Sequence, residues 1–307
     1  MPKISIIIIS YNMAREVPRT VESFLPPYQT GMDPDDVEVI VMENGSPHPV
    51  PVDVRSSWPS SVRYHFVEDA HPSPAQALNQ GIAMASADLV CPVIDGARMA
   101  SPGLLYWGLK SIAGNPRSIA LTAGFHLGDK LQQIAVEEGY CQATEDALLQ
   151  SINWPSNGYR LFEICALAGS AQFAWFGDLR ESNAPILPKS LFEEMGGYDE
   201  AFDIPGGGLI NLDFLKRLQE LEGTQCYTIL GEGTFHQFHG GVTTSRRVHK
   251  PESDGVTTWK KYNDQYRAIR GEDYRAPSGK PILFGRLVPE ASKIAETGLN
   301  NMMARAS

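Results

Sequence analysis

The sequence predicts an α/β fold: a mostly parallel central sheet flanked by helices, with a helical and loop insertion and a C-terminal helical tail. Two observations predict it. Apolar runs rich in β-branched residues show no polar alternation, which is typical of strands buried on both faces. Segments with helical spacing separate these runs, and such a series favours parallel strands joined by right-handed crossovers. With 42% hydrophobic and 20% charged residues, the 307-residue chain can bury a substantial core.

The N-terminal third carries the clearest pattern. Strands are predicted over residues 3–9, 37–42, 62–67 and 89–94. Residues 14–25 and 74–85 are predicted as helices, because their apolar residues recur three and four positions apart. Pro26 and Pro27 end the first of these helices, since the residue before a proline disfavours helical geometry.

The rest of the chain is predicted from the same patterns. Helices are expected over 104–114, 131–138, 145–152, 189–195, 210–221, 256–270 and 290–303, and strands over 119–124, 184–187 and 226–230. Residues 125–177 mix acidic and aromatic side chains and are predicted as an insertion with its own small core. The tail, 251–307, packs either on the body or against a second subunit in a homo-oligomer, and both alternatives stay open.

Composition excludes several classes of protein. A net charge of −10 argues against broad nucleic-acid binding, which needs clustered Lys and Arg. Residues 4–9 form an apolar run too short to cross a bilayer. The cysteines lie far apart without paired spacing, which favours reduced thiols in a cytoplasmic protein over disulfides or a zinc site. They are Cys91, Cys141, Cys165 and Cys226.

Polar turns follow three of the predicted strands. They are Ser10-Tyr11-Asn12, Glu43-Asn44-Gly45-Ser46 and Asp95-Gly96-Ala97-Arg98. Parallel strands would bring all three turns to one edge of the sheet, where open α/β sheets bind ligands. Gly96 allows a ligand to approach the backbone closely, and Arg98 offers donors to a phosphate or carboxylate. The alternative is that Asp95 caps the next helix.

Four segments together resemble the glycosyltransferases with the GT-A fold, of the family-2 type. They are Ile4–Asn12, Val39–Ser46, Pro74–Val90 with Ala75-Gln76-Ala77-Leu78-Asn79, and Gly196-Gly197-Tyr198-Asp199-Glu200-Ala201-Phe202 before a helix that carries Arg217. The likeness covers about residues 3–105 and 183–240. It implies a main GT-A domain over 1–250, with a nucleotide-binding half at 1–105 and an acceptor-side insertion at 125–177, and a helical extension over 251–307.

The resemblance implies transfer of a sugar from a nucleotide-diphosphate sugar to a hydroxyl of a carbohydrate or other acceptor. Ser10, Tyr11 and Asn12 would line the base, Glu43 would bind the base or ribose, and Asn79 would lie near the diphosphate or sugar. Asp95 would match the first acid of the D-x-D motif and, with Gly96 and Arg98, would hold the donor and a divalent cation, Mn²⁺ or Mg²⁺. The aromatic side chains of the insertion would contact the acceptor sugar.

The sequence departs from the family pattern at two positions. Ala97 replaces the second acid of the D-x-D motif, and Asn211 stands where the family has its catalytic base. Asp213 is the alternative base, although it lies about 200° around the helix from Asn211. Glu181 and Asp199 are further candidates, and a retaining transfer without such a base stays open.

His236 and His239 follow the strand predicted at 226–230 and are three residues apart. The resemblance implies that a late histidine, His239 first and His236 second, joins Asp95 around the metal. Imidazole suits Mn²⁺ better than Mg²⁺. Arg246 and Arg247 would add positive charge if the metal were weakly held. The alternative is that one histidine caps a turn and the other lies in the core.

Two other functions are compatible with this pattern. The missing second acid and Asn211 also suit a non-catalytic protein that binds nucleotide sugars or carbohydrates on the same fold. A nucleotidyltransferase would share the parallel sheet and the carboxylate chemistry. However, residues 11–15 match its Gly-rich basic loop poorly, and the chain has neither a dinucleotide-binding nor a P-loop motif.

Overall fold

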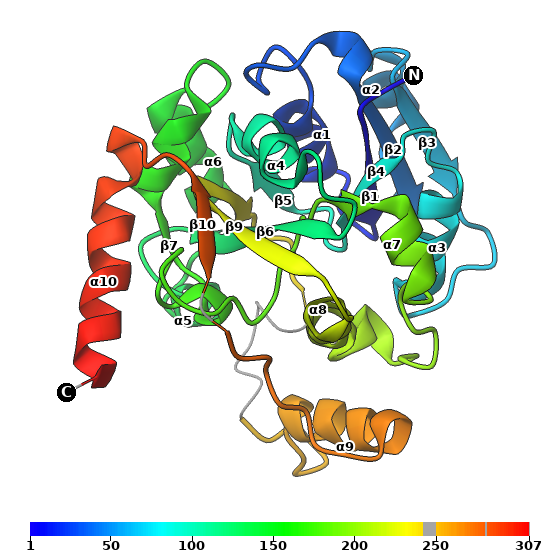
Figure 1. Cartoon of the computed structure of the whole chain (residues 1–307), viewed down its shortest axis with the longest axis vertical. Coiled ribbons are helices and arrows are strands. Elements are labelled where there is room, and N and C mark those ends of the chain that lie inside the picture. Colours follow the sequence, from blue (N-terminus) through cyan, green and yellow to red (C-terminus); the bar gives the residue numbers. More distant parts are fainter. Residues whose placement is uncertain (242–249, 280, 307) are drawn as a thin grey trace.

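The computed structural model describes residues 1–241, 250–279 and 281–306 (Figure 1). Its first sheet has the strand order β3-β2-β1-β4-β8. The strands are β1 (Ile4–Ser10), β2 (Val37–Glu43), β3 (Val62–Phe66), β4 (Leu89–Val93) and β8 (Leu187–Pro188). The first four run parallel and β8 runs antiparallel to β4, so the predicted mostly parallel sheet is confirmed.

Strand β1 lies between two parallel neighbours and is buried along its whole length. Its β-branched run explains this position, because both faces of the strand meet apolar side chains. Helices α1 (Val17–Phe24), α2 (Val52–Ser56) and α3 (Ala75–Ala83) connect the strands. Helix α1 starts at Val17, later than the predicted residue 14, because Asn12 has a left-handed backbone (φ 55°) and residues 13–16 form turns.

A second sheet has the order β10-β9-β6-β7, and a short strand β5 pairs antiparallel with β9. The strands are β5 (Arg98–Ala100), β6 (Ser118–Leu127), β7 (Cys165–Leu167), β9 (Gln225–His236) and β10 (Ile282–Gly285). A backbone bridge between Ala120 and Ile186 joins the sheets. Strands β5, β7 and β10 were not predicted. Strand β9 was predicted to end at residue 230. It continues to His236, paired with β6, with Gly231 at φ 79° inside it.

The insertion shares its core with the second sheet, so the prediction that it has a core of its own is wrong. Phe162 of the insertion contacts the ring of Phe235 on β9, and the Trp175 indole N–H donates to the Glu232 carbonyl of β9 at 2.7 Å. The remaining helices are α4 (Leu104–Ile112), α5 (Gln132–Glu137), α6 (Gln142–Ile152), α7 (Lys189–Glu194), α8 (Ile210–Glu220), α9 (Thr258–Arg270) and α10 (Ser292–Ala306).

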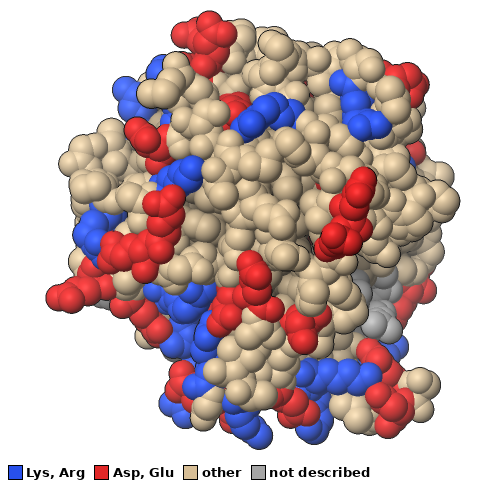
Figure 2. Space-filling model, turned by 90° about the vertical axis from the view of Figure 1, so that its right-hand side faces the viewer, with Lys and Arg blue, Asp and Glu red and all other residues tan. Residues whose placement is uncertain are grey.

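The C-terminal tail packs on the body of the same chain. Strand β10 adds to the sheet beside β9, and Tyr266 of α9 and Ile294 of α10 belong to the main core. In Figure 1, α9 lies across the bottom of the molecule and α10 runs along one side. Figure 2 shows Lys and Arg interspersed with Asp and Glu on one face. No helix among the described residues is long and apolar enough to cross a membrane.

Candidate functional site

Asp95, His236 and His239 meet where β4 and β9 end. The Asp95 carboxylate lies 2.9 Å from His236 Nε2 and 3.6 Å from His239 Nε2, and the two imidazole nitrogens are 3.2 Å apart. The pairing of β5 with β9 brings them together. It sets Arg98 opposite His236, and Asp95 lies only three residues before Arg98 in the chain. One ligand atom from each side chain lies within 4.8 Å of the others, so the cluster can hold a metal ion.

The charges in this cluster suit a metal site. Burial alone would raise the pKa of Asp95, but His236, His239 and Arg98 hold it well below its usual range. Burial lowers the pKa of His236 to about 4 against the opposing effect of Asp95, so the imidazole is neutral at physiological pH. A carboxylate and neutral imidazoles are the protonation states in which these groups bind metals. The donor set of two nitrogens and one oxygen fits Mn²⁺ better than Mg²⁺.

Arg98 is a buried cation beside this cluster. Only 5% of the residue is exposed. Its Nε lies 3.4 Å from Asp95 and its Nη2 lies 3.8 Å from Glu181. Its Nη1 is buried and has no hydrogen-bond partner among the described residues. A buried guanidinium with unused donor capacity is suited to bind an anion that enters the site.

The sequence analysis missed His126, which lies opposite His236 across the β6–β9 pairing. The two rings are 5.6 Å apart, and His126 Nδ1 accepts the backbone N–H of Gln132 at 2.9 Å. Burial, His236 and Arg98 hold the pKa of His126 well below its usual value, so it is neutral. Strand β6 was predicted to end at residue 124, which left His126 outside the strand. A longer strand would have marked it as a strand-end histidine.

A chain of amides connects this cluster to α8. The Asn211 side chain donates to Asn183 at 3.1 Å, and the Asn183 side chain donates to Glu181 at 2.6 Å. The Glu181 side chain is 22% exposed, so it is accessible from outside. Asn211, which was expected at the position of the family's base, is therefore linked through Asn183 to the carboxylate of Glu181.

Asp213 faces away from this chain of contacts. It is fully buried and receives Arg217 at 2.8 Å and Arg270 at 2.7 and 2.8 Å on its two carboxylate oxygens. Arg270 also pairs with Asp199 at 2.7 Å. These contacts tie α9 to α8 and leave neither Asp213 nor Asp199 positioned to take a proton from an acceptor.

The turns predicted to bind the nucleotide lie at the carboxyl ends of β1 and β2, as the parallel pairing requires. Tyr11 is 53% exposed and available for stacking, and the backbone N–H of Asn12 donates to the Ser46 hydroxyl at 2.8 Å. Glu43 is fully buried and accepts from Ser10 at 2.8 Å, as well as from the Ser46 hydroxyl. Glu43 thus fixes the turns rather than presenting a free carboxylate.

Gly96 and Asn79 have structural contacts of their own. A Cβ on Gly96 would lie 2.4 Å from the Ile9 carbonyl oxygen, so only glycine allows the β4 turn to pack against β1. The Asn79 amide donates to the Tyr198 carbonyl and to Glu200, both at 2.9 Å. This side chain fastens α3 to the segment after α7. Arg246 and Arg247 lie outside the described residues.

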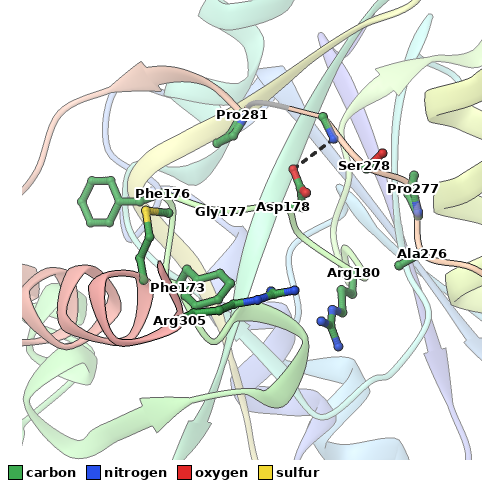
Figure 3. A pocket seen from close by; sticks show the side chains of 12 residues that line it. Phe173, Phe176, Gly177, Asp178, Arg180, Ala276, Pro277, Ser278, Pro281 and Arg305 are labelled. Atoms are coloured by element: carbon green, nitrogen blue, oxygen red, sulfur yellow. Dashed lines mark hydrogen bonds between the residues drawn. The ribbon is translucent and has the colours of Figure 1, made fainter. Parts of the chain in front are cut away.

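A cavity of about 410 Å³ has Arg180, the residue before Glu181 in the chain, in its wall (Figure 3). Its lining includes Phe173, Phe176, Asp178, Arg180 and Arg305. Asp178 accepts the Gly279 backbone N–H at 3.2 Å. The segment from 178 to 183 therefore lines the cavity at its start and reaches the Asp95 cluster at its end.

The structure resembles crystal structures of S. aureus TarS. TarS 1-349 in complex with UDP-GlcNAc matches with a TM-score of 0.59 and 13% identity, covering 98% of this chain and 73% of that chain. TarS 1-349 in complex with UDP matches with a TM-score of 0.53 and 12% identity, over 77% of this chain and 60% of that one. A further TarS structure matches with a TM-score of 0.53 and 12% identity, over 78% of this chain and only 37% of that one. At this identity the likeness shows the fold, GT-A.

The comparison with curated proteins found no match. The model of the glycosyl transferase family 2 matches residues 5–160, just over half of the 307 residues. This range contains the three polar turns and Asp95. The chain therefore belongs to glycosyl transferase family 2.

Proposed function

We propose that this chain is a hexosyltransferase that uses a divalent cation, held by Asp95, His236 and His239, to transfer a sugar from a nucleotide-diphosphate sugar to an acceptor hydroxyl. The observation that carries the proposal is the meeting of these three side chains at the strand edge of a family 2 domain. Because TarS structures contain UDP and UDP-GlcNAc, a UDP-sugar is the first donor to test. The free cysteines suit a cytoplasmic location.

The donor's charge sets the first chemical requirement. When bound, Mn²⁺ or Mg²⁺ supplies positive charge that stabilises the leaving diphosphate. Arg98 adds a second, permanent cation through its unpartnered Nη1. Ala97 replaces a family carboxylate, so the site has one negative charge fewer with which to hold a cation. The Arg98 guanidinium supplies positive charge for the diphosphate that does not depend on the metal. Tyr11, exposed at the end of β1, stacks on the base.

The acceptor hydroxyl must lose a proton as the new bond forms. Asn211 has no basic group, and Asp213 is bound by two arginines. Glu181 is the partly exposed carboxylate that remains in this region, and Asn183 orients it through a 2.6 Å hydrogen bond. We therefore assign Glu181 as the general base of an inverting transfer.

The acceptor enters through the cavity in Figure 3. Phe173 and Phe176 provide apolar faces, and Asp178, Arg180 and Arg305 provide polar groups at its wall. Rings combined with charged hydrogen-bonding groups suit a carbohydrate. An acceptor bound there would extend along residues 178–181 toward Glu181.

The test measures UDP-GlcNAc and UDP-glucose turnover, and UDP affinity, with and without Mn²⁺. Wild-type protein should bind UDP more tightly with Mn²⁺ and release UDP from a donor, whereas Asp95→Ala should lose both effects. UDP affinity that ignores both Mn²⁺ and the substitution would overturn the metal role. Metal-dependent UDP binding without turnover of any nucleotide sugar would favour the non-catalytic binding protein, which Asn211 and Ala97 also suit.

A further inference from the structure

His239 lies in a segment beyond the end of β9, which stops at His236. Its ring must still stay within 3.2 Å of the His236 ring and 3.6 Å of Asp95. A strand ladder no longer fixes the backbone there, so other contacts must. We propose that Glu145 of α6 is a positioning residue that holds segment 237–239 and thereby sets where His239 stands in the metal site. This inference rests on the proposed metal role of His239.

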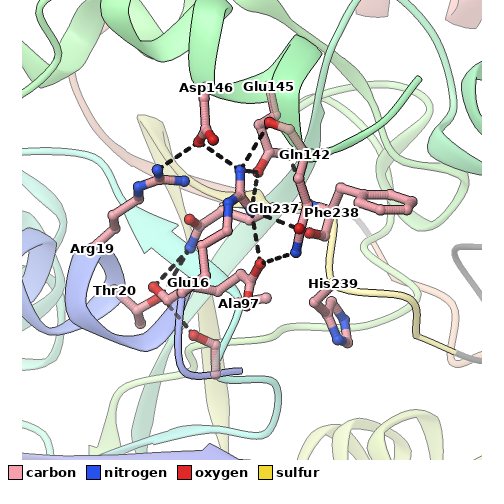
Figure 4. A network of polar contacts seen from close by, with 12 residues as sticks. Glu16, Arg19, Thr20, Ala97, Gln142, Glu145, Asp146, Gln237, Phe238 and His239 are labelled. Carbon is pink, nitrogen blue, oxygen red and sulfur yellow. Dashed lines mark hydrogen bonds and ion pairs between the residues drawn. The ribbon is translucent and has the colours of Figure 1, made fainter. Parts of the chain in front are cut away.

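The segment has two anchors (Figure 4). The first is Gln237, which is fully buried. Its backbone N–H donates to the Ala97 carbonyl at 2.8 Å, and its amide donates to the Glu16 carbonyl and the Thr20 hydroxyl, both at 3.2 Å. This anchor fixes the segment on the side of α1 and the turn after β4.

The second anchor is Glu145, on the other side of the segment. Its carboxylate accepts the Phe238 backbone N–H at 2.7 Å. The Phe238 carbonyl in turn accepts Arg15 Nη1 at 3.4 Å. The peptide units on both sides of Phe238 are therefore held, and His239 is the next residue. Losing this anchor would free the backbone that carries the His239 ring.

Glu145 is itself held firmly. The residue has no exposed surface, and Nη1 and Nη2 of Arg15 each lie 3.3 Å from its Oε1. The Tyr140 hydroxyl donates to its Oε2 at 3.3 Å. A buried carboxylate is costly unless hydrogen bonds and an ion pair compensate it, and here part of that compensation comes from the Phe238 amide. The insertion helix α6 and the metal ligand are thus coupled through one side chain.

The next residue, Asp146, offers a matched control. It pairs with the same Arg15 at 2.7 Å and with Arg19 at 2.6 Å, but its side chain is 47% exposed. No contact between Asp146 and segment 237–239 is found among the described residues. A substitution there weakens the Arg15 cluster but leaves the hydrogen bond between the Phe238 N–H and Glu145 in place.

The experiment measures Mn²⁺ affinity by electron paramagnetic resonance and calorimetry, together with the Co²⁺ absorption spectrum, for Glu145→Ala, Glu145→Gln, Asp146→Asn and His239→Ala. Measurements at about pH 8 keep Glu145 ionised, since burial raises its pKa to about 7. Glu145→Ala should weaken Mn²⁺ binding about 10- to 100-fold, as loss of a residue that orients a metal ligand does. Glu145→Gln, which keeps an acceptor oxygen for Phe238, should recover much of it. Asp146→Asn should stay within about 2-fold of wild type.

A double-mutant cycle tests whether Glu145 acts through His239. In the His239→Ala background, Glu145→Ala should cause no further loss of Mn²⁺ affinity. Equal losses in the wild-type and His239→Ala backgrounds would overturn the positioning role, as would unchanged affinity and Co²⁺ spectrum in Glu145→Ala. Unchanged affinity in His239→Ala alone would instead overturn the proposed metal site. If Glu145→Ala fails to fold, Glu145→Gln decides: because an amide oxygen accepts the Phe238 N–H less strongly than a carboxylate, its Mn²⁺ affinity should fall below that of Asp146→Asn, and equal affinities would overturn the positioning role.

Discussion

Two carboxylates stand at the ends of parallel strands in the same sheet, Glu43 as the last residue of β2 and Asp95 two residues after β4, yet their surroundings differ. Glu43 is fully buried and its partners are hydroxyls and an amide, including Ser10 at 2.8 Å and Val50 N–H at 3.2 Å. Asp95 instead faces two imidazoles and the guanidinium of Arg98. A carboxylate whose oxygens are occupied by nearby hydroxyl and amide donors stabilises the turn, whereas one beside imidazoles can share a cation with them.

The sharpest way to break this comparison is to remove each charge with an isosteric amide. Asp95→Asn should lower kcat/KM about 10³-fold, because a charged metal ligand is worth several kcal/mol in the transition state. Its unfolding free energy should also fall, because the buried Arg98 loses a charged partner, so kcat/KM is compared on the folded fraction. Steady-state kinetics with a UDP-sugar and urea unfolding of the same samples measure both effects.

Glu43→Gln should lower the unfolding free energy with little effect on kcat. The unfolding free energy should fall by about 1–3 kcal/mol, because buried donors of the turn lose a charged acceptor. The kcat of the folded fraction should change only a few-fold. A large loss of kcat without a loss of stability would mean that Glu43 contacts the donor directly, as the family resemblance implies.

A third carboxylate sharpens the assignment of the base. Glu181→Gln should lower kcat about 100-fold and remove the acidic limb of the kcat pH profile, since loss of a general base costs about 10²–10⁴-fold. Asn211→Asp restores an acid at the family's position and should raise the activity of Glu181→Gln. An unchanged pH profile in Glu181→Gln would show that another group, or a retaining mechanism, performs this step.

Glu232 of β9 is a buried carboxylate with hydroxyl partners, and its expected effect is on stability rather than on activity. Burial raises the pKa of Glu232 to about 7, although Ser101, Tyr159 and the Gly103 amide oppose the rise. Because the folded-state pKa of Glu232 lies above its unfolded value of 4.5, the contribution of Glu232 to the unfolding free energy is greatest below pH 4.5. This contribution falls as the pH rises to about 7. The loss is on the order of 3 kcal/mol for a shift of this size.

Glu232→Gln should therefore flatten the decline in unfolding free energy between about pH 5 and pH 8. Chemical denaturation across this range measures it. Glu220→Gln is the control, because the Glu220 side chain is 53% exposed and pairs with Lys216 on the surface. A slope that survives in Glu232→Gln would have to come from another buried acid, of which Glu145 is the first to test.

The N-terminal half of the fold could be predicted because its signals are local. The apolar run at 4–9 predicts a buried strand. The prolines at 26 and 27 end a helix whatever its tertiary contacts are. The second sheet was harder because β5 has only three residues and β9 passes through Gly231 and Gly233. Glycines in a sequence predict turns. Here the pairing of β9 with β6 and β10 keeps the chain extended through both glycines.

The sequence by itself determined the residue types at the site: a strand-end aspartate, two histidines three apart, and an asparagine where a base is expected. Only the tertiary structure decided which of them act together. Pairing of β5 with β9 brings Asp95 to His236, and the arginines of α8 and α9 occupy Asp213. The physical reason is that strand and helix signals act over a few neighbouring residues, whereas the contacts of Asp95 with His236 and of Asp213 with Arg270 join positions more than fifty residues apart, whose pairing depends on packing of the whole chain.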